Sequence, residues 1–428
     1  MIATSLSLLL ALSPAQALTR DQVIAETMRP YRGGSNSGVD RRTLNGKVMT
    51  GYQGWFAAHG DGSSMGWFHW GNQNGFDAQN CTVEMWPDMS EYDADERYAT
   101  SFKYPNGQTA EVFSCYNRKT VLRHFRWMKD YGIDGAFVMR FGVRIDKPVD
   151  LRFTNTVLNH AREGANLNGR AYAIMYDLSS LPRGGTAKVI ADWKLLVDRM
   201  RIRNDPAYIR HNYKPVVGVW GIGFGDNRKY TLSECKDLIN FLKYDARYGG
   251  NTVVVGVPTY WRSRNRDSVT DPRLHDVIRS ADIVCPWTIG RYRTVADARL
   301  YARNQLAGDI TWCRGNRMEM MPTVYPGFSW SNARAATFNE VPRRGGQFLW
   351  TQFAEARQAG ARMVFQAMFD EVDEATAIFK VSQTPPQASG VQFLTHEGQS
   401  NDYYLWLVGQ GTKMIRGLSP LRFDAPSR

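Results

Sequence analysis

The strongest constraint on this chain is a strand-like segment followed by a helix-like segment, a pattern that occurs eight times. The last strand-like segment, residues 363–369, is a nearly continuous apolar run, which suits a strand covered on both faces. Helical spacing of apolar residues fills the intervals, as in residues 118–131. The expected strands are 47–56, 135–141, 171–178, 215–221, 251–258, 282–289, 318–325 and 363–369.

This alternation predicts an α/β fold, a parallel (β/α)8 TIM barrel. The alternative is an open doubly wound sheet. That fold favours a glycine-rich phosphate turn after its first strand, and residues 51–54 (GYQG) have neither the GxGxxG spacing nor a following helix. No linker divides residues 18–428, so we predict a single domain, with a helix within residues 391–417 packing onto the barrel and closing it.

A long segment without strand or helix periodicity, residues 57–119, follows the first strand and is rich in Gly, Asn, Asp and Trp. Loops of this length in compact domains are usually lids or binding loops. We therefore expect this segment to fold over the face of the barrel where the strands end.

The first 17 residues are typical of a secretory signal peptide, with an apolar stretch at residues 6–12 and a small-residue exit at Ala15-Gln16-Ala17. We expect cleavage after Ala17 and a secreted or periplasmic protein. No other segment approaches the roughly 18 apolar residues of a membrane span, so no membrane partner is expected.

The charge of the chain limits the partners that it can bind, and its cysteine content limits the disulfides and metal sites that it can form. The formal net charge is +12, but the basic residues are scattered and form no run of five, which argues against nucleic acid and leaves an anionic glycan or an acidic cell envelope as a partner. The five cysteines are an odd number without CxxC spacing, so at most one disulfide, Cys81–Cys115, is expected. No metal and no cofactor are predicted, and we expect a monomer.

Active sites of such barrels lie at the carboxyl ends of the strands. Taken singly, each aromatic residue at a strand end is better explained by core packing. However, nearly every strand end carries Tyr or Trp, which core packing explains less well. Aromatic faces also pack well against sugar rings. Aromatic residues make up 12% of the chain, which favours a carbohydrate ligand. The predicted substrate-binding residues at these ends are Tyr52, Trp55, Arg140, Asp177, Trp220, Trp287, Tyr325 and Trp330.

Four carboxylates, Asp370, Glu371, Asp373 and Glu374, directly follow the eighth strand. Acids in the first turn of a helix favour its positive end, which explains one or two of them. Four acids behind a buried strand instead indicate a functional site. Paired acids in an aromatic pocket suit glycoside hydrolysis, in which one acid protonates the leaving oxygen and the other assists attack at the anomeric carbon.

Three segments carry a family resemblance: 47–56 (KVMTGYQGWF), 115–141 (CYNRKTVLRHFRWMKDYGIDGAFVMRF) and 369–380 (FDEVDEATAIFK). They resemble bacterial members of glycoside hydrolase families 71 and 99, most closely a branch often labelled xylosidase/arabinosidase. The resemblance spans essentially the whole chain after the signal peptide.

Family 99 enzymes are retaining endo-acting α-mannosidases that use a Glu-x-x-Glu pair. The resemblance implies that Glu371 acts as a base on the sugar's 2-hydroxyl and that Glu374 acts as the general acid. The motif here, Glu-Val-Asp-Glu-Ala, lacks the aromatic residue and the glycine of family 99. Family 71 α-1,3-glucanases invert, so the stereochemistry stays open.

The sequence therefore predicts a glycoside hydrolase acting on an α-linked glycan, with Glu371 and Glu374 as catalytic residues. Asp370 and Asp373 are added to the substrate-binding set, either capping the next turn or orienting an arginine. A helical segment would put the two glutamates on one face, with the pKa of Glu374 raised. The alternatives are a non-catalytic carbohydrate-binding protein on a TIM-barrel scaffold, and a lyase or transglycosylase. Four arginines near strand ends favour an anionic glycan: Arg140, Arg262, Arg291 and Arg293.

Overall fold

The computed structural model describes residues 17–38 and 40–428. The predicted signal peptide therefore lies outside the described residues except for its last residue, Ala17. Within the described part of the chain, no helix is both long and apolar enough to cross a membrane.

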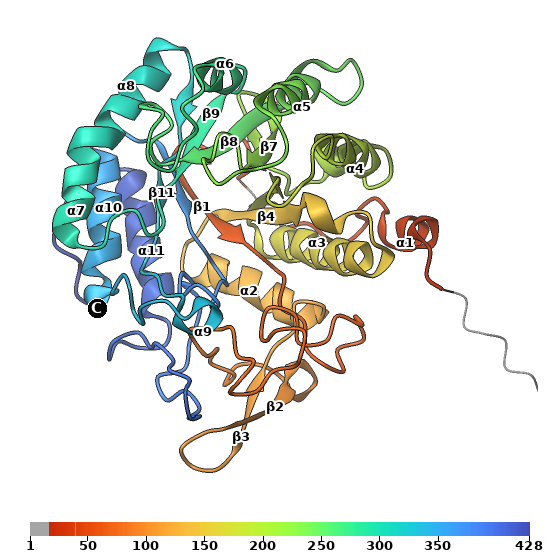
Figure 1. Ribbon diagram of the computed structural model, residues 1–428, viewed down its shortest axis with the longest axis vertical. Coiled ribbons are helices and arrows are strands. Elements are labelled where there is room, and N and C mark those ends of the chain that lie inside the picture. The colour runs from red at the N-terminus through yellow and green to blue at the C-terminus, as the bar shows by residue number, and fades with distance from the viewer. Residues whose placement is uncertain (1–16, 39) are drawn as a thin grey trace, which may run out of the picture.

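Parallel strands form one curved sheet with the order β10-β9-β8-β7-β5-β4-β1-β12-β11 (Figure 1). All the expected strands are present, most within one or two residues of the predicted bounds. The full-length strands are β1 (Lys47–Tyr52), β4 (Gly135–Phe141), β5 (Ala171–Asp177), β7 (Lys214–Trp220), β8 (Thr252–Pro258), β9 (Ile283–Trp287) and β12 (Met363–Gln366). The short β6 (Arg210–His211) pairs with β7 at its start.

The seventh barrel strand closes the sheet, although it is split into β10 (Glu319–Met320) and β11 (Thr323–Val324). Pro322 lies between the two halves and lacks the N–H that a continuous ladder needs. β10 pairs with β9, and β11 pairs with β12 on the opposite side. The N–H of Met321 donates to Val284 O at 2.9 Å, and the carbonyl of Pro322 accepts from the N–H of Phe365 at 2.9 Å. The architecture is thus the predicted (β/α)8 barrel.

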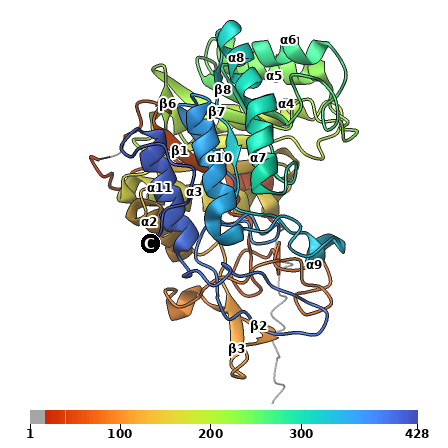
Figure 2. The ribbon, with the colours of Figure 1, turned by 90° about the vertical axis from the view of Figure 1, so that its left-hand side faces the viewer.

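Helices surround the barrel and follow its strands in turn (Figures 1 and 2). A capping box starts α5, because Thr231 and Glu234 satisfy each other's backbone N–H groups. The helices are α1 (Arg20–Thr27), α2 (Arg118–Asp130), α3 (Pro148–Asn168), α4 (Thr186–Asp198), α5 (Leu232–Tyr244), α6 (Arg273–Arg279), α7 (Val295–Tyr301), α8 (Ala307–Gly315), α9 (Ser331–Arg334), α10 (Gln347–Gln358) and α11 (Tyr403–Ile415). A π-helical segment, Ala302–Leu306, joins α7 to α8, and short 3-10 turns lie at Ala94–Glu96, Gly142–Arg144, Ile202–Asn204 and Arg344–Gly346.

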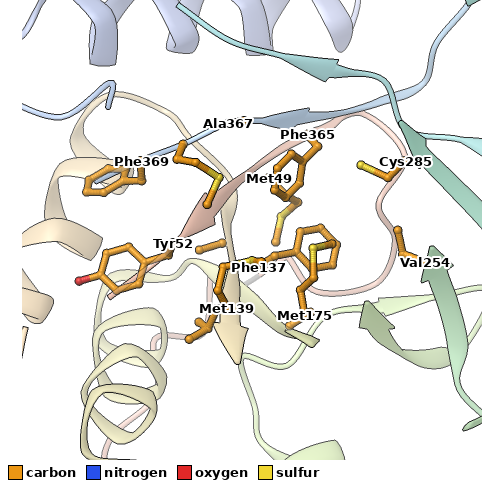
Figure 3. Close-up of a cluster of buried hydrophobic side chains, with 14 of the residues drawn as sticks. Met49, Tyr52, Phe137, Met139, Met175, Val254, Cys285, Phe365, Ala367 and Phe369 are labelled. Carbon is orange, nitrogen blue, oxygen red and sulfur yellow. The ribbon is translucent and has the colours of Figure 1, made fainter. Parts of the chain in front are cut away.

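The C-terminal helix α11 packs beside α10 and against β1, as predicted for a closing helix (Figure 2). Inside the barrel, side chains from several strands meet in one apolar core (Figure 3). Met49, Phe137, Met175 and Phe365, from four neighbouring strands, are buried there. This filled interior leaves the functional surface to the loops at the strand ends.

The long segment after β1 contributes to the face where the strands end. It carries a β-hairpin, β2 (Tyr98–Lys103) and β3 (Thr109–Val112), which projects from the barrel in Figure 1. Glu84 of this segment is buried, and its carboxylate accepts from Ser329 Oγ, Ser331 Oγ and Asn332 N. The segment is thereby tied to the chain that follows the seventh strand.

Three local expectations are wrong. The last strand ends at Gln366 rather than at residue 369, and residues 372–380 form a turn followed by irregular chain instead of a helix. Furthermore, all five cysteines are buried free thiols, so Cys81 and Cys115 form no disulfide.

Candidate active site

The acidic segment after β12 folds into a turn at the mouth of the barrel. Asp370 anchors it, because its carboxylate accepts from the N–H groups of Gln53 and Gly54, each at 2.8 Å. Burial raises the pKa of Asp370 to about 7, against the lowering effect of those two bonds. Its side chain is fully buried, so Asp370 ties β12 to the end of β1 rather than facing solvent.

Glu371 projects into a cavity of about 660 Å³, which we call the central cavity. Two side chains orient its carboxylate: Gln53 Nε2 donates at 2.7 Å and Thr376 Oγ1 donates at 2.6 Å. Neither partner is among the residues predicted from the sequence. With both carboxylate oxygens bonded, Glu371 is held in one orientation.

Glu374 lies between the central cavity and a neighbouring cavity of about 800 Å³, which we call the loop cavity. The two cavities share Trp55, Trp330, Arg334 and Glu374. Because the Glu374 side chain borders both spaces, it lies at the point where an extended ligand would pass from one to the other.

Asp373 faces the loop cavity and is paired with His69, whose Nδ1 lies 2.8 Å from Asp373 Oδ2. Burial lowers the pKa of His69 well below its usual range and raises that of Asp373 to about 8. The pair is therefore a neutral hydrogen bond rather than an ion pair near pH 7. Trp55 stacks on His69, with ring centroids 3.7 Å apart and an interplanar angle of 4°.

The carboxylates of the turn raise one another's pKa. Burial holds the pKa of Glu371 well above its usual range, and the charges of Glu374 and Asp373 add to the effect. Burial also raises the pKa of Glu374 to about 8; the Asp373 charge contributes, while a hydrogen bond from Trp330 opposes it. The expected rise at Glu374 is thus present, but Glu371 is raised as well. This cluster retains protons near neutral pH.

Aromatic side chains form the wall of the central cavity. Trp220 and Trp287 meet edge to face, with centroids 5.3 Å apart. The neighbouring strand makes room for this arrangement at Gly256, where an added Cβ would lie 2.3 Å from Trp220 Cδ1. Asp177 lines the same cavity, and burial raises its pKa. These planar faces beside carboxylates provide stacking surfaces and hydrogen-bond acceptors for a sugar.

The structure brings Trp55, Asp177, Trp220, Trp287, Trp330, Asp373 and both glutamates to these two cavities. Three other predicted substrate contacts lie, like Asp370, beneath the cleft. Tyr52 is buried with its hydroxyl 2.9 Å from His124 Nδ1, and the hydroxyl of Tyr325 donates to Tyr292 O at 2.6 Å. Arg140 is bound to Asp192 inside the barrel wall. These side chains support the cleft but do not line it.

Five residues that line the cleft are missing from the sequence-based set, as is Thr376, which bonds to Glu371 from beneath it: Gln53, His69, Phe141, Arg228 and Arg334. His69 lies in the long segment after β1, and the length of that segment was the sequence feature that pointed to a binding role. Gln53 sits between two predicted residues, but nothing local indicated that it would bond to Glu371, 318 residues away. No group of three His, Cys, Asp or Glu side chains in residues 17–38 and 40–428 is arranged to hold a metal ion.

The fold and the site define the chain as a (β/α)8-barrel protein with a carboxylate-bearing aromatic cleft at the carboxyl ends of its strands. Among solved structures it is similar to the glycoside hydrolase family 99 endo-α-mannosidase from Bacteroides thetaiotaomicron. For the complex of that enzyme with bis-tris-propane, the TM-score is 0.63 at 13% identity, covering 88% of this chain and 99% of that one. A second structure of the enzyme has a TM-score of 0.60 at 14% identity and the same coverage.

A third similar structure is described as a glycoside hydrolase-like protein, with a TM-score of 0.52 and 13% identity over 91% of this chain and 99% of that one. No protein-family model matches the chain, and no curated protein is significantly similar to it in sequence. At these identities the likeness establishes a shared fold, which agrees with the resemblance to family 99.

Proposed function

We propose that this protein is a glycoside hydrolase that cleaves an α-linked glycan, with Glu374 as general acid and Glu371 as base. The observation that carries the proposal is that both side chains reach one aromatic cavity at the carboxyl ends of the barrel strands. The family 99 fold adds support, because solved structures with that fold include an endo-α-mannosidase.

In the proposed reaction, protonated Glu374 gives its proton to the glycosidic oxygen as the bond from that oxygen to the anomeric carbon breaks. Ionised Glu371 accepts a proton from the attacking hydroxyl, either a water molecule or the sugar's own 2-hydroxyl; in the second case a 1,2-anhydro sugar forms, and water that gives its proton to Glu374 then opens it. Gln53 and Thr376 hold the Glu371 carboxylate in position for this transfer. The raised pKa of Glu374 supports its role as an acid that stays protonated near neutral pH.

For the substrate we propose an anionic glycan bound by Trp55, Asp177, Trp220, Trp287, Trp330 and Asp373. Arg228 and Arg334 both line the central cavity. Arg228 lies over Trp220, with its guanidinium carbon 5.0 Å from the ring centroid, and is paired with Asp226. Of the four arginines first considered, Arg262 is bound to Asp309 and Arg140 to Asp192, so those two do not support the proposal.

We also propose that the protein is exported after cleavage behind Ala17, on the strength of the apolar N-terminal segment, and that it is a monomer. Export can be tested by N-terminal sequencing of the protein recovered outside the cytoplasm, which should begin at Leu18. Light scattering of the purified protein measures its oligomeric state.

The test is release of reducing ends from a panel of neutral, uronic and sulfated α-linked polysaccharides. We expect hydrolysis by the wild-type protein and none by Glu371→Gln, with Glu26→Gln on the exposed face of α1 as the matched control. Binding of a glycan without release of reducing ends would instead identify a carbohydrate-binding protein. An unsaturated uronic product would identify a lyase.

The pH dependence should reflect the coupled carboxylates. Activity is expected to rise with pH only above the range in which an ordinary carboxyl group ionises, because Glu371 must lose a proton whose pKa burial holds well above the usual range. In Asp373→Asn, a carboxyl group whose ionised form raises the pKa of both glutamates is removed, so the alkaline limb of the kcat/KM profile, where Asp373 itself would ionise, should move to lower pH by about one unit. Asp276→Asn, on the exposed surface of α6, is the control. A shift to higher pH, or no shift, would contradict this coupling.

A further inference from the structure

A third cavity, of about 540 Å³, borders the central cavity on the side of β8 and β9. We call it the distal cavity. The loops after β8 and β9 and the start of the helical segment beyond them form its wall, and it shares Arg291 and Arg293 with the central cavity. Because these two side chains border both spaces, a chain-like ligand in the central cavity can continue into the distal one.

Aromatic and amide groups line the distal cavity. Tyr301 stacks on Tyr292, with ring centroids 5.0 Å apart and an interplanar angle of 26°, and Tyr260 stands on the loop after β8. Asn265 and Asn304 add amide groups that both donate and accept hydrogen bonds. This combination suits a sugar ring, which offers an apolar face and a rim of hydroxyls.

The backbone around the distal cavity departs from regular geometry on two sides. The wall formed by Asn304 and Gln305 belongs to the π-helical segment Ala302–Leu306, and such insertions in helices are frequent at functional sites. On the facing loop, Arg264 and Arg266 both have φ of +52°, a left-handed conformation that is uncommon for arginine. Strain of this kind persists where the surroundings hold it, and it clusters at ligand sites.

Of the three arginines that line the distal cavity, two are paired with carboxylates in the described residues and one is not. Arg291 is paired with Asp267 at 2.8 Å, and Arg293 is paired with Glu340. Arg266 makes no ion pair with a carboxylate in the described part of the chain. Its Nη1 donates to the Tyr260 hydroxyl at 2.5 Å, and its guanidinium carbon lies 4.3 Å from the centroid of that ring.

One carboxylate, Asp297, also lines the distal cavity, but among the described residues it forms no ion pair with Arg266. Asp297 Oδ2 accepts from the N–H of Thr294 at 3.1 Å and so caps α7. The distal cavity is therefore lined by three arginines and one carboxylate, and it presents the guanidinium of Arg266 on an aromatic surface, which is an arrangement suited to an anion.

We propose that the distal cavity is a subsite for an anionic sugar residue, either a uronate or a sulfate ester. The acidic group pairs with Arg266, and the sugar ring packs against Tyr301. This inference rests on the proposed function, because the subsite extends the same cleft and selects the substrate that reaches the two glutamates.

The test measures binding to the Glu371→Gln protein, which separates affinity from turnover. The probes are three hexasaccharides: an α-1,4-galacturonan, its carboxyl-reduced neutral form and a sulfated α-mannan. We expect the protein to bind an anionic probe more tightly than the neutral one. Adding Arg266→Gln should weaken the binding of the anionic probe about tenfold and leave the neutral probe unchanged. Arg266→Lys should retain part of the affinity, and Arg273→Gln on α6 is a control with the same charge change.

Preference for one of the two anionic probes identifies the acidic group as carboxylate or sulfate. Equal binding of all three probes, failure to bind any of them, or equal losses in Arg266→Gln and Arg273→Gln would overturn the subsite. The proposed function fails separately. Arg266-dependent binding without hydrolysis by the wild-type protein would refute the proposed catalysis but support the subsite. Hydrolysis that does not depend on Arg266 would support the proposed catalysis but refute the subsite.

Discussion

Glu371→Gln is expected to lose hydrolysis of every substrate, by about 10³-fold or more, whereas Glu374→Gln should lose it only where the leaving group needs a proton. The amide at position 371 cannot accept the proton of the attacking hydroxyl, so attack is unassisted whatever the leaving group. The amide at position 374 cannot donate a proton, but an activated aryl glycoside departs without one. Comparison of a natural glycan with an aryl glycoside therefore separates the two roles.

The rates of the four single amide variants at positions 370, 371, 373 and 374 decide the assignment, with Glu26→Gln as the control for an exposed glutamate. Both glutamate variants should stay folded and bind glycan, because each amide replaces its carboxyl group at nearly constant volume. If Glu371→Gln and Glu374→Gln retain near wild-type rates while Asp177→Asn loses activity, the catalytic pair lies elsewhere in the cleft.

Arg140→Met should have the largest effect on stability, lowering the free energy of unfolding by about 3–5 kcal/mol, while the folded variant keeps its glycan affinity. Arg140 Nε donates to Asp192 Oδ2 at 2.6 Å, and Nη2 donates to Asn155 Oδ1 at 2.9 Å. Tyr176 also donates its hydroxyl to Asp192, at 2.6 Å. The substitution leaves the buried Asp192 charge without its cation, which is costly in an environment of low polarity.

Urea unfolding of Arg140→Met measures this cost, and the double variant Arg140→Met/Asp192→Leu should recover part of it, because both charges are then removed. Arg247→Met breaks an exposed pair with Asp198 and should leave the free energy of unfolding almost unchanged. A stable Arg140→Met protein that has lost glycan affinity would show that Arg140 contacts the substrate after all.

The repeating pattern of strands and helices was readable from the sequence because both periodicities are local. A buried parallel strand is an apolar run, and an amphipathic helix repeats its apolar residues every three or four positions. The structure differs from the predicted elements where pairing between segments distant in sequence decides the outcome. Pro322 divides the seventh strand, yet the barrel still closes because each half pairs with a different neighbour.

The segment that carries the proposed catalytic pair was also readable, because four acids behind a buried strand have no simple structural explanation. Which strand-end residues would face the cleft was less predictable. Tyr52 and Tyr325 lie at strand ends like Trp220, but their rings point into the packed interior and their hydroxyls find partners there. Residue type alone does not distinguish these orientations, because a tyrosine suits either environment.

The sequence by itself determined the order of the elements, the barrel class and the segment that carries the acids. Only the tertiary structure decided that Asp370 is an anchor, that Glu371 is oriented by Gln53, and that His69 of the long loop pairs with Asp373. The physical reason is that hydrogen-bond partners and burial depend on groups brought together from distant parts of the chain. Such encounters leave no periodic signal around either residue, whereas strands and helices are defined by their neighbours in sequence.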